Sequence, residues 1–548
     1  MSTDTAAPAL PNHGLPVPEV SRIVRALVVL VVLAYPMVYL GMYAGDAEIH
    51  LVYGANAAHG GFFEFNRGET SPGVTSPGFM LMIAALFRCL PAVAVPLAVK
   101  AIDLLAWYGL CLIVFLLARR VGLTGGWAWS AACVAGLIPG SAYNATIGME
   151  NGVFALAVLA WIYFALVTGW FDVAPSTAGL RALRNEGLHG GFLGLAVWLR
   201  PEGLVIGALA LAHRAFRSVR AGSDPWWTAM RSIAFLTTFV PVTGLLVAFH
   251  HAYTGCFLPG SGRARMLMGS LDAFWIGPLA INTRVIGRLA AYFPVTLAWL
   301  AGVRLVLKRQ VTTDSAQAAA EFFVLLASSF FVLYSTVLGA AHLARYLIFV
   351  MPPFVLVSVL GARWSWELPG RLAFVPVRRP GRAAVLVLVT VLGVVFAFET
   401  RQRFELGPHD EVLRAMRAPR ERGSHSDSLY AALGAPVELP VVVGAQEVQV
   451  RYWLDDRFVV RSLDGRTDPL LLEFADRRRF DHVGYIKARN IRFLLELPNY
   501  NGDRSAWSLE TLEQLAPTEV LTREGLAFSR LPGGEGFFRV ERGRPQAP

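Results

Sequence analysis

Charged residues are scarce in this chain, because Asp, Glu, Lys and Arg together make up 16% of its 548 residues. Soluble domains carry ~25% charged residues, so the composition excludes an ordinary soluble enzyme. Hydrophobic residues reach 55%. They gather in repeated blocks, several of them near the ~20 apolar residues that a helix needs to cross a bilayer. The chain is therefore predicted to be a polytopic α-helical membrane protein.

Cysteine is rarer still, with four residues in the chain. All four lie in or beside apolar blocks: Cys89, Cys111, Cys133 and Cys256. This placement argues against disulfide bonds and against a cysteine metal site. The sequence also lacks an internal repeat and a glycine-rich phosphate loop of P-loop or Rossmann form, so no nucleotide site is predicted.

About eleven membrane spans are predicted. The first, at 23–44, follows a polar, proline-bearing segment that makes a poor signal peptide, so we expect it to be retained. A block at 77–91 is ambiguous, since it could cross the membrane or dip in and return. The other predicted spans are 97–118, 127–142, 151–170, 190–199, 203–213, 231–250, 284–307, 320–338, 345–361 and 383–399. The two short spans, 190–199 and 203–213, meet at Arg200-Pro201-Glu202, because proline disfavours helix at the residue before it.

Basic residues decide the predicted orientation. If the N-terminus is cytoplasmic and 77–91 does not cross, the basic clusters of the connecting loops fall inside, from Arg119-Arg120 to Arg382. The positive-inside rule favours this threading, which also accounts for the net charge of +10 without nucleic-acid binding. This threading puts the first outer loop and residues 400–548 outside the cytoplasm. Its polar outer segments are 45–76, 143–150, the Arg200 break, 250–266 and 342–345.

Three parts of the chain are expected. Residues 1–22 form a cytoplasmic tail, and 23–399 form a transmembrane catalytic domain whose first outer loop is 45–76. From residue 400 the apolar blocks give way to short β-rich segments such as 437–444, 457–463 and 490–497. Residues 400–548 are therefore predicted to be a soluble extracytoplasmic α+β domain.

The main candidate site begins directly after the first span, with Asp46, Glu48 and His50. Acids at a membrane surface are costly, so they point to function. In a helix, Asp46 and His50 share a face at i, i+4, and Glu48 points elsewhere. A carboxylate here suits a general base that takes a proton from an acceptor hydroxyl. A capped, solvated surface helix is the structural alternative, and a divalent metal is left open.

Other polar residues are expected on the same outer face. Glu150 opens an apolar block, where it is either a first-turn acid favoured by the helix dipole or a substrate contact. Arginine forks bind phosphate well, although a single arginine near a span is more often a snorkelling residue. Together with Glu48 and His50, the predicted substrate-binding residues are Glu150, Arg200, Glu202, Arg263, Arg265, His342 and Arg345.

An ordered series of motifs resembles the C-type (GT-C) membrane glycosyltransferases. It is most similar to the arabinofuranosyltransferases that use decaprenyl-phosphate arabinose. The series begins with Asp46-Ala47-Glu48-Ile49 and GGFFEFNRGETSPGVTSP (60–77). It continues with Gly148-Met149-Glu150, Leu199-Arg200-Pro201-Glu202, Tyr253-Thr254-Gly255…Leu258-Pro259…Ala264-Arg265, Arg345-Tyr346-Leu347 and Leu463-Asp464-Gly465-Arg466-Thr467-Asp468-Pro469. The resemblance spans most of the chain, and its specificity lies in the order of the motifs.

The resemblance implies a GT-C fold and transfer of a sugar from a polyprenyl-phosphate donor to a cell-envelope glycan or glycolipid. It also implies Asp46 as the catalytic base and an extracytoplasmic site. Two departures stand out: Gly45 occupies the place of the first of two acids, and Thr70-Ser71-Pro72 replaces a basic and an acidic residue. These departures leave the donor sugar open. The alternatives are a lipid-linked sugar flippase or transporter, and a catalytically inactive glycan-binding protein.

Overall fold

The computed structural model of the chain describes most of the membrane part and much of the C-terminal part. The described residues are 29–30, 32–43, 45–123, 125–138, 141–172, 179–257, 259, 293–311, 313–336, 348–367, 411–433, 439–445, 448–463, 467–474, 481–495, 512, 519–531 and 537–542.

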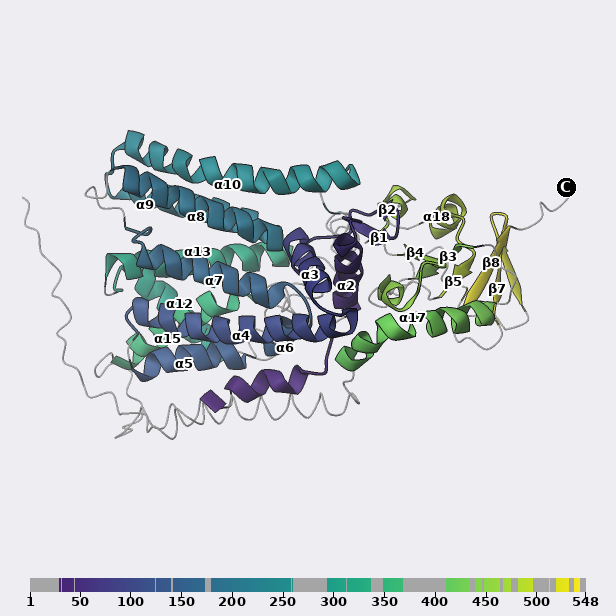
Figure 1. Cartoon of the computed structure of the whole chain (residues 1–548). Helices are drawn as coiled ribbons and strands as arrows, with labels where there is room; N and C mark the ends of the chain where they lie inside the picture. Colours follow the sequence, from purple (N-terminus) through teal and green to yellow (C-terminus); the bar gives the residue numbers. More distant parts are fainter. Residues whose placement is uncertain are drawn as a thin grey trace, which may run out of the picture.

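Long helices, packed side by side, form a bundle at one end of the molecule (Figure 1). They are α4 (Val95–Arg120), α5 (Gly126–Leu137), α6 (Ser141–Thr146), α7 (Asn151–Val167), α8 (Leu180–Leu199), α9 (Glu202–Arg220), α10 (Pro225–Thr254), α12 (Phe293–Leu307), α13 (Asp314–Thr336) and α15 (Met351–Glu367). Within the bundle α8 packs on α10, α4 on α5 and α7, and α12 on α15. One large apolar core joins them, with Trp107 and Trp161 fully buried.

Three described helices are long and apolar enough to cross a membrane: Ala92–Arg120, Pro225–Thr254 and Asp314–Leu333. The prediction of a membrane protein is therefore supported, whereas the count of eleven spans is not established. The predicted span 383–399 lies outside the described residues, as do the first residues of 23–44 and of 284–307.

Three predicted spans differ from the helices of the structure in their bounds. The block 127–142 is not one helix, since α5 ends at Leu137 and α6 begins at Ser141. Pro139 disfavours helix at Ile138, which has a ψ of 128°. The short blocks 190–199 and 203–213 prove to be parts of the longer helices α8 and α9. Polar residues at the far ends of these helices lower the local hydropathy without ending the helix.

The ambiguous block 77–91 forms the short helix α3 (Pro77–Cys89). At ~1.5 Å per residue its 13 residues reach only ~20 Å, less than the ~30 Å hydrocarbon core. It packs against α2 (Gly45–Ala58) beside one end of the bundle (Figure 1). This length favours the threading in which 77–91 does not cross.

The first outer loop folds as α2 followed by a two-stranded hairpin, β1 (Glu64–Asn66) and β2 (Glu69–Thr70). Gly68 has a φ of +79°, which suits the hairpin turn. The aromatic side chains Phe63 and Phe65 are buried beneath it. The predicted polar, glycine-rich loop is thus an ordered platform between the bundle and the C-terminal part.

The C-terminal part is built around a six-stranded mixed sheet in the order β4-β3-β5-β8-β7-β6. The strands are β3 (Val441–Ala445), β4 (Phe458–Ser462), β5 (Phe493–Leu494), β6 (Val520–Arg523), β7 (Leu526–Arg530) and β8 (Phe538–Arg542). Helices α17 (Glu411–Leu433) and α18 (His482–Arg489) accompany it, with the 3-10 turns η4 (Val448–Trp453) and η5 (Pro469–Phe474). β3 lies parallel to β4 and β5, and β8 is antiparallel to β5. The three predicted strand segments are confirmed.

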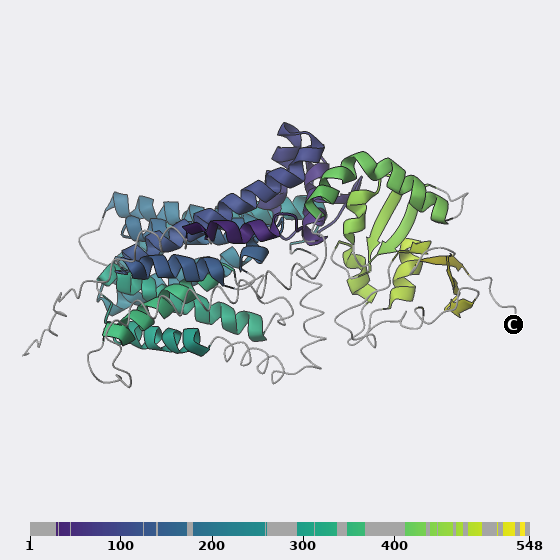
Figure 2. The same ribbon diagram turned by 90° about the horizontal axis from the view of Figure 1, so that it is seen from below.

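The hairpin is bonded to this sheet at several points. The Asn66 amide bonds to the backbone of Val460 as both donor and acceptor, at 2.9 Å in each case. Arg461 donates to Glu69 at 2.8 Å. These contacts join segments almost 400 positions apart in sequence. Figures 1 and 2 both place α2 and the hairpin between the helical bundle and the sheet.

Candidate active site

α2 presents the three predicted polar residues in its first turns. Asp46 and His50 are one helical turn apart on one face, as predicted, and Glu48 lies on another face. Asp46 is half-buried, whereas only 7% of His50 is exposed. The helix begins at Gly45, the position where the resemblance leads one to expect a second acid.

His50 points into the bundle, toward the start of α7. Its Nε2 lies 3.2 Å from Oε2 of Glu150, and its ring stands edge-on to Phe79 of α3 at 5.3 Å between centroids. Glu150 is 3% exposed and is the N-cap residue of α7, but its side chain makes no capping hydrogen bond. Its carboxylate is used instead in contacts with side chains of other helices.

Arg200 completes a buried polar cluster with Glu150. At the predicted break between α8 and α9, the backbone of Arg200 is extended, with φ −156° and ψ 140°. Its Nη1 donates to Oε1 of Glu150 at 2.8 Å. Its Nη2 and Nε donate to the two carboxylate oxygens of Glu202, at 2.6 Å and 3.2 Å. The guanidinium, 6% exposed, is therefore shared by two carboxylates.

Glu48 of α2 accepts a hydrogen bond from the C-terminal part of the chain. The indole Nε1 of Trp453, in η4, donates to its Oε2 at 3.1 Å. Burial raises the pKa of Glu48 to about 7, although the Trp453 hydrogen bond and the nearby Arg414 lower it. The neighbouring charge of Glu411 raises it further. A carboxyl group that titrates near neutrality thus stands two positions from Asp46.

This pKa predicts a pH-dependent stability. The pKa of Glu48 rises from its ordinary value of 4.5 to about 7 on folding, so the folded state retains a proton that the unfolded state releases. The stabilising contribution is complete below pH ~4.5 and is lost as the pH rises through ~7. The melting temperature of the wild type should therefore fall, relative to that of a Glu48→Gln variant, between pH 5 and 8. Parallel melting profiles across this range would contradict the assignment.

Two charged residues that sequence reasoning missed hold the turn before Glu150. Asp103 of α4 accepts a 2.7 Å hydrogen bond from the Gly148 backbone amide. Lys100, one turn earlier, donates to the carbonyls of Met42 and Thr146. Both side chains are fully buried. Charges inside an apolar span are a recognised sign of function, and this signal could have found them.

Gly148 itself makes the close approach of this turn to α2 possible. Its φ is +83°, and a Cβ atom there would lie 2.6 Å from the Tyr43 ring and 2.9 Å from Cβ of Ala47. Gly148→Ala should therefore lower stability by about 2–5 kcal/mol, from backbone strain plus overpacking. The matched control is Gly222→Ala, where φ is +66° and no atom lies within 4 Å, so only strain acts. Equal losses of melting temperature in the two variants would argue against the packing explanation.

The remaining predicted residues cannot be located. Arg263, Arg265, His342 and Arg345 lie outside the described residues. Within the described part of the chain, no group of three or more His, Cys, Asp or Glu side chains is arranged to hold a metal ion.

The polytopic bundle, the outer platform and the mixed sheet together have the GT-C fold. Three solved structures carry this conclusion. The chain matches ArnT from Cupriavidus metallidurans bound to undecaprenyl phosphate, with a TM-score of 0.51 and 16% identity over 95% of this chain and 99% of that one.

The other two are structures of the Archaeoglobus fulgidus oligosaccharyltransferase. In the apo form the TM-score is 0.51, with 13% identity over 86% of this chain and 69% of that chain. With a tethered acceptor peptide the TM-score is 0.53, with 12% identity over 96% and 75%. No protein-family model and no curated protein matches the sequence.

Proposed function

We propose that this protein is a glycosyltransferase that moves a sugar from a polyprenyl-phosphate donor to a cell-envelope glycan or glycolipid. The observation that carries the proposal is the placement of Asp46, half-buried at the start of α2, one turn before the buried His50–Glu150–Arg200 cluster. The fold it shares with ArnT, which was solved with undecaprenyl phosphate, supports the class of donor.

Asp46 acts as the general base. It takes the proton of an acceptor hydroxyl while that oxygen attacks the anomeric carbon of the donor sugar. The bond between the anomeric carbon and the phosphate oxygen breaks, and the polyprenyl phosphate leaves with the electron pair. No nucleotide is needed, because the leaving phosphate is already attached to the sugar.

Arginines outside the described residues bind the leaving phosphate in this proposal. Arg265 and Arg345 supply the fork, and Arg263 and His342 are assigned as further substrate ligands. Arg200 is assigned a positioning role instead, because Glu150 and Glu202 already share its guanidinium. A phosphate at Arg200 would have to displace a buried carboxylate, which is costly.

His50 is the nearest described candidate for a direct substrate contact besides Asp46. Its Nε2 faces Glu150, and its buried Nδ1 has no hydrogen-bond partner within the described part of the chain. A buried polar nitrogen without a partner is costly, so a substrate hydroxyl there would satisfy it. Glu48 contributes to the same site from the other face of α2.

The reaction is assigned to the extracytoplasmic face of a bacterial inner membrane. The basic loop clusters support this orientation, because the favoured threading puts them in the cytoplasm and 45–76 outside. The C-terminal domain, 400–548, is then also outside, where it positions the acceptor.

The test of the proposal is a mass comparison of cell-envelope glycans from a deletion strain and the wild type. A missing sugar residue, restored by the intact gene, is expected. Purified protein in detergent should then transfer a labelled sugar from a polyprenyl-phosphate donor to the truncated glycan. Identical glycan profiles in the two strains would overturn the enzymatic proposal.

A further inference from the structure

A polar cavity of about 480 Å³ lies between α2 with its hairpin and the C-terminal domain. This volume falls within the ~300–1,000 Å³ typical of ligand pockets. One wall is the C-terminal half of α2, including Asn56, with His59 directly after the helix and the hairpin turn at Arg67. The opposite wall carries Arg422 of α17 and Arg451 of η4.

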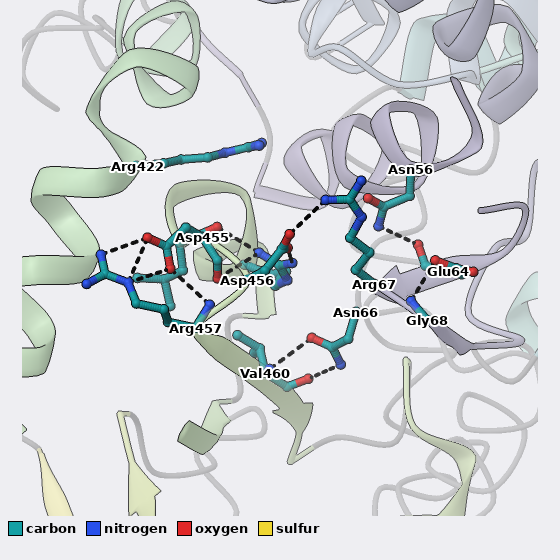
Figure 3. A network of polar contacts seen from close by, with 12 residues as sticks. Asn56, Glu64, Asn66, Arg67, Gly68, Arg422, Asp455, Asp456, Arg457 and Val460 are labelled. Carbon is teal, nitrogen blue, oxygen red and sulfur yellow. Dashed lines mark hydrogen bonds and ion pairs between the residues drawn. The ribbon is translucent and has the colours of Figure 1, made fainter. Parts of the chain in front are cut away.

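Two of the three arginines in the cavity share one carboxylate. Asp456 accepts from Nη1 of Arg67 at 3.0 Å (Figure 3). It also accepts from Nη2 of Arg451 at 2.9 Å. Partial burial raises the pKa of Asp456, but these two hydrogen bonds outweigh that effect and bring it below its ordinary value. The two cations share a single negative charge, which leaves this part of the cavity net positive.

Arg422 is the unbalanced cation of the cavity. It extends from α17 toward Arg67 (Figure 3). Its Nε donates to the Tyr452 carbonyl at 2.8 Å, and its guanidinium stands 5.1 Å from the centroid of the Tyr452 ring. Within the described part of the chain no carboxylate is in ion-pair contact with it. Its two Nη groups thus remain available to a bound molecule.

The surroundings of Arg422 favour an anion. Burial lowers the pKa of Arg422 most and repulsion from Arg451 lowers it further, whereas Tyr452 and, more weakly, Asp456 and Asp455 raise it. A bound negative charge would remove both costs at once. The other acid of the cavity, Glu64, accepts from the Gly68 amide at 2.8 Å and so is already used in the hairpin.

Neutral polar groups beside the arginines suit a sugar. The Asn56 amide donates to the Glu64 carbonyl at 2.9 Å, which fixes its orientation. The exposed His59 donates from Nδ1 to the Ala55 carbonyl at 2.8 Å, so its Nε2 can bond to a ligand hydroxyl. Amide, imidazole and guanidinium groups in one polar cavity are the chemistry expected for a charged saccharide rather than for a lipid.

We propose that this cavity binds an anionic group, a carboxylate or phosphate, on the acceptor glycan, with Arg422 as its main ligand. The assignment of the bound glycan as the acceptor rests on the proposed function. The cavity lies along α2, the helix that begins at Gly45 and carries Asp46. An acceptor held at Arg422 would thus be placed by the same element that carries the catalytic base.

The test is direct binding to full-length protein in detergent, without any donor. Three probes are compared: a galacturonic acid tetrasaccharide, a galactose tetrasaccharide and mannose 6-phosphate. The structure predicts that one or both acidic probes bind at least about 10-fold more tightly than the neutral one, with affinity falling as salt increases. Preference for the tetrauronate indicates a carboxylate, and preference for the hexose phosphate indicates a phosphate. Equal binding of all three probes overturns the proposal.

Variants identify the arginine. Arg422→Gln should weaken binding of the preferred acidic probe about 10-fold or more, and Arg422→Lys should restore part of the loss. The control is Arg420→Gln, an exposed arginine on the same helix, which should bind like the wild type. If Arg422→Gln fails to fold, the proposal is still tested by two measurements. They are the affinities of the wild type for the acidic and neutral probes, and the affinity of Arg422→Lys for the preferred acidic probe. Unchanged binding in Arg422→Gln would also overturn the proposal.

These outcomes are separate from those of the proposed function. Acidic-probe binding with no sugar transfer would leave the cavity assignment standing and refute the transferase. Transfer to an envelope glycan without a preference for the acidic probes would support the transferase and refute the cavity assignment.

Discussion

Replacing Asp46 with asparagine is expected to lower sugar transfer by a factor of about 10²–10⁴, the usual contribution of a general base. The variant keeps the size and shape of the side chain at the start of α2 but cannot take a proton. Binding of a polyprenyl phosphate should change little, because the donor phosphate is assigned to arginines elsewhere. Transfer of a labelled sugar and retention of the lipid on purified protein measure the two effects.

The matched control for this variant is Asp224→Asn. Asp224 is the N-cap of α10, in the short connection after α9, and accepts from the Trp226 backbone amide at 3.0 Å. Asparagine caps a helix as well as aspartate does, so this change should be silent. Full activity in Asp46→Asn would remove Asp46 as the base. Only an absence of transfer by the wild type would favour the transporter or the inactive glycan binder over the transferase.

Replacing Arg200 with methionine is expected to destabilise the protein by about 3–5 kcal/mol. The change leaves Glu150 and Glu202 buried without their shared cation, and an uncompensated buried charge is costly. The melting temperature of purified protein measures the effect. The exposed pair of Arg67 with Asp456, 66% and 54% exposed at the side chains, gives the control, since Arg67→Met should cost only about 0–1 kcal/mol.

A double variant separates this charge effect from lost packing. Glu150→Gln combined with Arg200→Met removes one of the two uncompensated carboxylates. Its loss of stability should be smaller than the sum of the single losses, because the two residues interact at 2.8 Å. Additive losses, or a melting temperature of Arg200→Met equal to that of the wild type, would show that the cluster does not stabilise the bundle.

Several features of the fold follow from local sequence. The apolar blocks correctly predict the helices α4, α7 and α10, because a membrane span is a matter of composition along one segment. Pro201 predicts the break at Arg200, since proline restricts the backbone of its neighbour. The short runs rich in β-branched residues likewise predict β3 and β4. The lengths of helices are predicted less well. For example, α8 continues through polar residues that a hydropathy threshold excludes.

Local sequence predicts only part of the candidate site. The i, i+4 spacing puts Asp46 and His50 on one face of α2, and the acids at a membrane boundary mark the segment as functional. The sequence gives no reason to pair Glu48 with Trp453, which is 405 positions away. It also gives no reason to link Arg422 to a cavity beside α2.

By itself, then, the sequence determined the membrane-spanning class, the helix break and the polar segment that carries Asp46, because each depends on neighbouring residues and their periodicity. Only the tertiary structure decided that Glu150 and Arg200 neutralise each other beside His50, and that a cationic cavity opens between α2 and the sheet. Such pairings depend on which distant helices and strands pack together. Packing brings charges into contact whatever their separation along the chain.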